Sequence, residues 1–394
     1  MKGLASKILI ALGIVLILAA ILWWAIAVNS LVKIPDDLDS TSKYEGEMTY
    51  YVNPTTHEPL PEGEEMKLPM KVERRVSSVA DEYDSSTAVL KEEVTVEVGG
   101  LKNPPGGLES IYVLDRKGSE NLNDERAYDF KAGNRVNREG SYYPLLPFDT
   151  SKDEAYKIWK GEIGEASDSE FIEEVESFGV TVYNFKGSAT LEDKKEVVPA
   201  YIELNGLPSE VTFEELKPRL QALGVDVDGL LALAQQRLSA EDLQSLNAAL
   251  QEKIPIKYYW TYDIETSVEP KTGAPVNLYK DVEAMYMEVD TSKLMGVFTI
   301  LAKYSSDPVL GPVLTQLMSL QGQLGEAKPQ KVLEYSIAQT EETVKSAIDD
   351  SKDAASKINL VKVYIPWALL IVGALLLIIG LLMGGGEVPE PAGE

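Results

Sequence analysis

The most prominent pattern in the chain is a pair of long apolar segments, one near each end. Residues 8–28 and 363–383 each consist of about 20 almost uninterrupted apolar side chains. At a rise of about 1.5 Å per residue, a helix of this length crosses the roughly 30 Å hydrocarbon core of a bilayer. No run between them is apolar for long enough to cross again. The pattern predicts two transmembrane helices with one large domain between them.

Charges beside the first apolar segment predict the orientation. Lys2 and Lys7 precede it without an acidic neighbour, which favours a cytoplasmic N-terminus. Two crossings then return the C-terminus to the cytoplasm, so residues 1–7 form a cytoplasmic tip, 29–339 an extracytoplasmic domain and 384–394 a flexible acidic tail. Lysines on the outer side of the second segment oppose this orientation, but the first helix usually dominates.

Aromatic residues near the outer ends of both segments are expected to anchor the helices in the headgroup region, which suits amphipathic rings. These residues are Trp23, Trp24, Tyr364 and Trp367.

A cleaved signal peptide is an alternative for the first segment, because Ala25-Ile26-Ala27 has the small-x-small form of a cleavage site. The apolar stretch before it exceeds the usual length of about 7–15 residues, which favours a retained anchor. The domain is exported in either case.

The domain between the apolar segments is expected to be rich in β-structure. Its short runs of β-branched and aromatic residues, several with alternating polarity, predict strands. The expected strands are 48–52, 70–76, 88–98, 108–115, 178–185, 197–204, 256–268, 276–289 and 332–338. Polar turns bearing Pro or Gly at 51–60, 112–118 and 267–276 join such runs. Their recurrence predicts repeated hairpins of a curved antiparallel sheet.

Helical spacing interrupts this pattern in three places. Residues 212–252 carry leucines at helical intervals, with Ser239 as an expected cap, and predict a small helical insert. We interpret these leucines as packing on one another, with partner binding as the alternative. A further short helix is expected at 310–324. Residues 340–362 predict an amphipathic stalk helix leading into the second span. The fold class is therefore α+β, with an antiparallel β-rich exported domain bracketed by transmembrane helices.

The composition excludes several classes of function. The chain has 37 basic and 63 acidic residues, a net charge of −26, so we expect no nucleic acid partner. The absence of cysteine excludes disulfides, thiolate catalysis and Cys-ligated metals. The single histidine, His57, lies in a polar turn and is interpreted as a solvated loop residue. We therefore predict no catalytic residue, no metal site and no cofactor.

Several stretches resemble one known family. They are Leu38–Ser42 with Glu45-Gly46, the segment 137–159, Val180–Phe185, Glu269–Gly273, and Asp350–Lys357 running into Ile365–Trp367. In these stretches the chain resembles the PorA family, also labelled DUF3068, over most of its length. The resemblance departs at 212–252. It implies two anchors and one exported domain, and it transfers no catalytic residues.

The porin name attached to that family does not follow from the strand pattern. A membrane β-barrel needs many segments with a continuous outward apolar band, whereas these strands carry charges on both faces. The hairpin turns are more similar to those of half-barrel lipid carriers such as lipoprotein chaperones. The plan of two anchors is similar to that of certain scavenger receptors. Both are similarities of layout, which do not establish function.

Three hypotheses for function follow. The first is a non-enzymatic, membrane-anchored cell-envelope protein with a structural or interaction role, whose partners are the bilayer and another envelope protein. The second is a binder or carrier of a lipid or other apolar ligand in a curved sheet, using Tyr258, Tyr259, Trp260 and Tyr262. The third is a carboxylate-dependent hydrolase. A filled core would favour the first, an apolar concavity the second, and two inward carboxyls with raised pKa the third.

Overall fold

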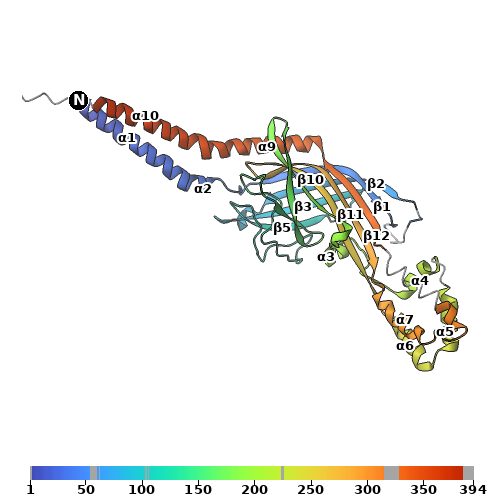
Figure 1. Cartoon of the computed structure of the whole chain (residues 1–394). Helices are drawn as coiled ribbons and strands as arrows, with labels where there is room; N and C mark the ends of the chain where they lie inside the picture. Colours follow the sequence, from blue (N-terminus) through green and yellow to red (C-terminus); the bar gives the residue numbers. More distant parts are fainter. Residues whose placement is uncertain are drawn as a thin grey trace, which may run out of the picture.

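The molecule has three parts arranged along one long axis (Figure 1). A pair of apolar helices occupies one end, a curved sheet the middle and a cluster of short helices the other end. The computed structural model describes residues 2–53, 60–61, 63–102, 104, 106–222, 226–314 and 328–384. His57, part of the helix expected at 310–324 and the tail after Gly384 lie outside the described residues.

The middle part is a 12-stranded sheet whose named strand pairs are all antiparallel. Its order is β4-β3-β2-β1-β12-β11-β10-β8-β7-β6, with β5 beside β3 and β9 beside β10. The strands are β1 Asp39–Tyr50, β2 Met66–Ser78, β3 Thr87–Val98, β4 Leu101–Lys102, β5 Leu108–Asp115, β6 Tyr156–Lys160, β7 Glu165–Ser177, β8 Val180–Ala189, β9 Glu210–Val211, β10 Ile254–Glu269, β11 Ala274–Val289 and β12 Gln330–Gln339. The predicted α+β class with an antiparallel sheet is confirmed.

Isolated bridges extend the pairing from one edge of this sheet to the other. Leu114 at the end of β5 bridges Asn121, the adjoining Glu120 bridges Tyr142, and Tyr142 bridges Ile158 in β6. The Tyr142 amide donates to the Lys157 carbonyl at 2.7 Å. Since β5 also pairs with β3, the backbone pairings run in a ring around the domain. The sheet is therefore curled into a barrel whose last side is irregular chain.

The β10–β11 hairpin shows how local chemistry fixes one connection of this ring. The Glu269 carboxylate accepts hydrogen bonds from the Lys271 and Thr272 amides and from the Thr272 hydroxyl. Gly273 follows with φ of 69°, which glycine adopts without steric cost. A Cβ at this position would collide with the carbonyl oxygen of Leu146, so the turn also packs against the loop that closes the barrel.

A helical cluster lies at the end of the long β10 and β11 strands (Figure 1). It contains α4 Phe213–Ala222, α5 Val227–Arg237, α6 Ala240–Leu250 and α7 Met295–Ala302. Leu230 and Leu246 pack there against Leu301. The Ser239 hydroxyl accepts from the Asp242 amide, which caps α6. The helices therefore bury their leucine faces against one another.

One predicted strand is wrong. The segment 197–204 forms the helix α3 Pro199–Leu204 instead. Pro199 occupies the first turn, where its missing N–H costs nothing and its fixed φ suits a helix. Short 3₁₀ helices also form at Ala80–Glu82, Leu191–Asp193 and Thr291–Leu294.

A single helical rod joins the sheet to the second apolar segment. It consists of α9 Glu341–Asn359, a π-helical turn Leu360–Tyr364 and α10 Ile365–Gly384. Val344 and Ile348 of α9 are buried against Val182 and Val276 on the outer side of the sheet. The segment expected to be a stalk therefore lies against the sheet over its first turns.

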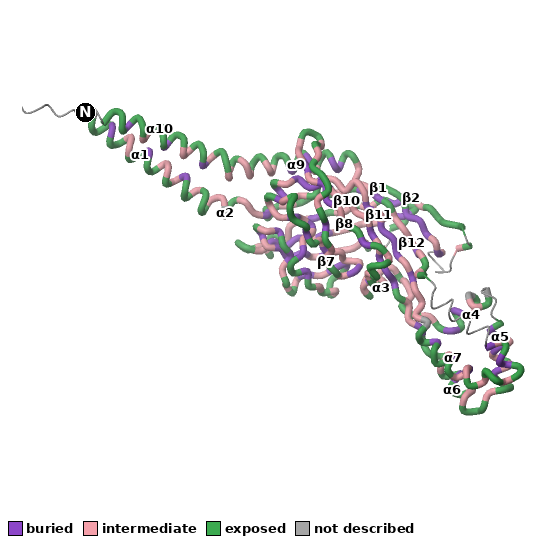
Figure 2. Tube along the Cα trace, in the orientation of Figure 1, coloured by how far each residue is buried: buried purple, intermediate pink, exposed green. Residues whose placement is uncertain are grey.

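The first apolar segment forms α1 Lys2–Leu22, a π-helical turn Trp23–Ala27 and α2 Val28–Leu31, and α1 runs alongside α10 (Figure 1). The Ser6 hydroxyl donates to the Gly380 carbonyl at 2.7 Å, and small residues allow close approach elsewhere, as at Gly13 beside Gly373. Away from this contact the apolar side chains are mostly exposed (Figure 2). Both helices are long and apolar enough to cross a membrane.

Candidate functional site

The barrel contains a partly open cavity of about 430 Å³. Its walls come from inward side chains of the curved sheet and from the irregular chain between β5 and β6. The lining is mostly aliphatic and aromatic, as at Tyr44, Met48, Val72, Val96, Trp260 and Tyr335. Small-ligand sites in proteins span about 300–1,000 Å³ and have predominantly apolar walls with a few polar groups. The interior of this barrel has the size and chemistry of such a site.

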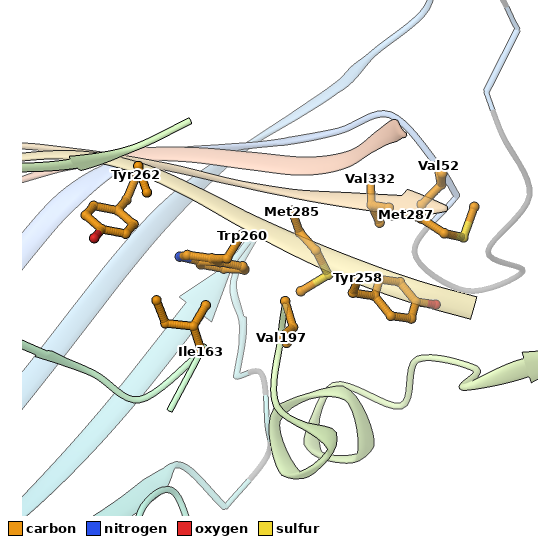
Figure 3. Packing of buried hydrophobic residues seen from close by; sticks show 10 residues of the cluster. Val52, Ile163, Val197, Tyr258, Trp260, Tyr262, Met285, Met287 and Val332 are labelled. Atoms are coloured by element: carbon orange, nitrogen blue, oxygen red, sulfur yellow. The ribbon is translucent and has the colours of Figure 1, made fainter. Parts of the chain in front are cut away.

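The four aromatic residues predicted to bind a ligand lie on β10, on two different faces of the strand. They are Tyr258, Tyr259, Trp260 and Tyr262. Trp260 and Tyr262 line the cavity, and Tyr258 shares their face within the same buried cluster (Figure 3). Successive side chains of a strand point to opposite faces, so Tyr259 lies on the other side. There burial, together with a hydrogen bond to Glu288, raises the pKa of Tyr259 to about 12. Only part of the aromatic run therefore faces the cavity.

A buried ionic cluster occupies the wall beside Trp260. The Lys160 amine lies 2.8 Å from a Glu283 carboxylate oxygen, and the Trp260 indole donates to the other oxygen. The Lys160 and Glu283 side chains are 13% and 2% exposed. Glu162 and Asp281 complete the cluster, which thus has three carboxyl groups around one amine.

The pKa values of these three carboxyls shift in different directions. Burial, reinforced by the negative charge of Glu283, raises the pKa of Asp281 well above its usual range. Burial also raises the pKa of Glu162, although the positive charge of Lys160 acts to lower it. Burial would raise the pKa of Glu283 as well, but the charge and hydrogen bond of Lys160 lower it overall. Within the cluster, the negative charge is therefore favoured on Glu283, which is paired with Lys160, over Asp281.

A second ionic pair lies on β2 and β3. The Arg74 Nε donates to the Glu92 carboxylate, which also accepts from the hydroxyls of Tyr112 at 3.0 Å and Tyr143 at 2.8 Å. The Tyr143 ring packs on the guanidinium, with 4.8 Å between the guanidinium carbon and the ring centroid. Glu92 is 5% exposed. Three donors thus stabilise its buried charge.

A third buried pair fastens the irregular side of the barrel. Arg138 is 1% exposed, and its guanidinium donates to the Asp129 carboxylate and to the carbonyls of Ile111 and Tyr128. The Trp159 indole donates to the second Asp129 oxygen at 2.9 Å. These bonds tie the closing loop to both β5 and β6.

Three buried polar atoms of residues that line the cavity have no hydrogen-bond partner among the described residues. They are Nη2 of Arg74, Oγ of Ser167 and Oδ1 of Asp281. Within the same residues, no group of three or more acidic or histidine side chains is arranged to hold a metal ion. The polar groups of the site are therefore hydrogen-bonding groups around an apolar interior.

The four aromatic residues predicted to anchor the membrane helices lie close to the π-helical turns. The Trp23 and Trp24 indoles each donate at 2.9 Å across the helix pair, to the carbonyls of Val361 and Lys362. Trp367 contacts Trp24 edge to face, with 6.2 Å between ring centroids. Tyr364 is exposed. Their expected place at the membrane interface stays a prediction.

The ionic pairs inside the barrel were not foreseen from the sequence. A signal for one of them was present, because Asp281, Glu283, Met285 and Met287 alternate along β11 and therefore share a face. Two methionines on that face mark it as the inner side. Nothing in the sequence pairs Glu283 with Lys160, which lies 123 residues away.

Comparison with known proteins supports a membrane assignment. The family described as Porin PorA matches residues 5–382, nearly the whole chain. No curated protein matches the chain significantly. Together with the two apolar helices, the family match identifies a membrane-associated protein. The resemblance seen in the sequence is confirmed, and the chain belongs to the PorA family.

Proposed function

We propose that the barrel binds a lipid or another apolar ligand in its cavity, as a non-enzymatic protein of the cell envelope. The observation that carries this proposal is the apolar cavity of about 430 Å³ inside the ring of strands. A filled barrel would have supported a purely structural role. Walls that are mostly aliphatic and aromatic suit the apolar part of a ligand that leaves water.

The outer surface supports a place for the domain outside the bilayer. Charged side chains pair across neighbouring strands there, as Arg75 does with Asp39 at 2.7 Å and Lys71 with Glu45 at 3.9 Å. Charges on a lipid-facing wall are destabilising, so this surface suits water. The interior rather than the outer wall is thus the apolar face that a ligand would use.

The proposed orientation places the domain on the extracytoplasmic side, with both termini cytoplasmic. Lys2 and Lys7 at the start of α1 support it. The Lys362 amine, just before α10, pairs with Asp149 in the chain that closes the barrel. This pair and the rod from α9 to α10 support a barrel held close to the membrane surface, from which a lipid ligand would come.

Native mass spectrometry of the full chain, released from a nonionic detergent and followed by lipid extraction, tests the proposal. Val72 lines the cavity and the adjoining Glu73 is exposed on the outer face, so Val72→Trp and Glu73→Trp add the same side chain inside and outside. We expect a bound lipid on the wild type and on Glu73→Trp, and a reduced fraction bound on Val72→Trp. Equal occupancy in both variants would contradict binding in the cavity.

A second candidate function is a carboxylate-dependent hydrolase. The observation that favours it is the pair of neighbouring carboxyls Asp281 and Glu283, whose pKa values shift in opposite directions. It ranks second because Glu283 is already bonded to Lys160 and Trp260. Hydrolysis of fatty esters or glycosides by the wild type, abolished in Asp281→Asn, would favour the hydrolase. No turnover over a panel of both classes would reject it.

A further inference from the structure

The guanidinium of Arg74 carries an unused donor within the wall of the cavity. Its Nε is bonded to Glu92, whereas Nη2 is buried and has no partner among the described residues. Arg74 lines the cavity and its side chain is 16% exposed. A buried donor without an acceptor is costly, and a ligand oxygen at this position would remove that cost.

The surroundings of Arg74 hold this donor in a fixed position. Glu92 fixes one edge of the guanidinium and the Tyr143 ring covers its face. Glu92 is itself held by the Tyr112 and Tyr143 hydroxyls. A donor that is already oriented loses little conformational freedom when a ligand binds, so it can contribute specificity.

The charge of the cavity wall selects among possible acceptors. The wall contains two basic residues, Arg74 and Lys160. It contains six acidic ones, namely Glu92, Asp129, Glu162, Asp168, Asp281 and Glu283. The positive charge of Arg74 is already paired with Glu92. Lys160 is likewise paired with Glu283, so a carboxylate or phosphate would find no unpaired positive charge in this wall.

We infer that Arg74 recognises an uncharged acceptor oxygen, such as an ester carbonyl, and that the ligand is a neutral amphipathic lipid. This inference rests on the proposed function and specifies its ligand class. The apolar walls would bury the hydrocarbon chain while Nη2 of Arg74 binds the oxygen.

The test uses three photoactivatable probes with the same hydrocarbon chain, ending in a methyl ester, a carboxylate or a methyl group. Each is titrated against the full chain in a nonionic detergent, and labelled peptides from β10 and β12 are quantified. Arg74→Lys keeps a positive charge beside Glu92 but removes the Nη2 donor, because the lysine side chain has a single nitrogen. We expect the ester to bind the wild type roughly tenfold more tightly than the hydrocarbon, an advantage that Arg74→Lys abolishes.

Labelling by the hydrocarbon probe reports whether the cavity stays intact, and it should be unchanged in Arg74→Lys. Arg75→Lys, on the exposed neighbouring residue, should keep the ester preference. The inference is overturned if the wild type binds ester and hydrocarbon alike, if Arg74→Lys keeps the preference, or if the carboxylate binds more tightly than the ester. Absence of cavity labelling by all three probes would overturn the proposed function itself.

Discussion

Replacing Lys160 by methionine would remove the only amine of the ionic cluster beside Trp260 while keeping most of the side-chain volume. Lys160 lies 2.8 Å from Glu283, and the two side chains are 13% and 2% exposed. This burial places the pair among those whose disruption costs about 3–5 kcal/mol, because one charge is left buried without a partner. Stabilities of whole domains are about 5–15 kcal/mol, so the loss would be easily measured.

The cost of Lys160→Met should depend on pH. The pKa of Glu283 is lowered by Lys160, so wild-type stability from this group is present above its ordinary pKa of 4.5 and lost as pH falls through the lower folded value. Without the amine, the buried carboxyls hold their protons while the unfolded chain releases them above that value. The deficit of the variant should therefore be largest near neutral pH and shrink towards acidic pH.

Urea unfolding of the full chain in a nonionic detergent, followed by tryptophan fluorescence at several pH values, measures this deficit. Lys157→Met is the matched control on the same strand, because Lys157 pairs with Asp168 at 3.2 Å while both side chains are 60% exposed. Exposed pairs contribute little, so this variant should remain close to wild type. Equal stability of the two variants at neutral pH, or a deficit of Lys160→Met that grows in acid, would refute the reasoning.

Two further predictions concern the β10–β11 turn and the membrane helices. Gly273→Ala should lower the unfolding temperature more than Gly179→Ala, since both glycines have positive φ but only a Cβ at 273 meets backbone; equal effects would contradict the packing of this turn. Ser6→Cys with Gly384→Cys should form a disulfide on mild oxidation of membranes, because the Cβ positions lie 3.8 Å apart in a chain without other cysteines. The control pair, Ser6→Cys with Leu382→Cys on the exposed side of α10, should form no disulfide. Failure of the first pair to form a disulfide would refute the pairing of the two helices.

The fold class could be predicted from the sequence because the signals that indicate it are local. Apolar segments of membrane length and hairpin turns such as Glu269–Gly273 depend on neighbouring residues only. The error at 197–204 arose because the apolar residues of this segment suit a strand, whereas Pro199 starts a helix. Barrel closure depends on isolated bridges such as Tyr142 to Ile158, which follow no periodic pattern and cannot be foreseen.

The candidate site was harder to foresee than the fold. Alternation along β10 places Trp260 and Tyr262 on one face, but it does not say whether that face meets a filled core or a cavity. The cavity depends on contacts between Trp159, Asp129 and Arg138, which hold the irregular chain across the barrel. Such contacts join residues far apart in sequence, and a single sequence does not reveal them.

Photolabelling in cells tests most directly whether the cavity is a ligand site. Cells expressing the full chain would be fed a fatty acid bearing a photoactivatable group, illuminated, and the labelled peptides of the purified protein mapped. We predict adducts on cavity-lining strands, around Trp260, Met285 and Tyr335, as well as on α1 and α10. Val72→Trp should lose the cavity adducts and keep those on the helices. Adducts confined to the transmembrane helices in the wild type would contradict the account.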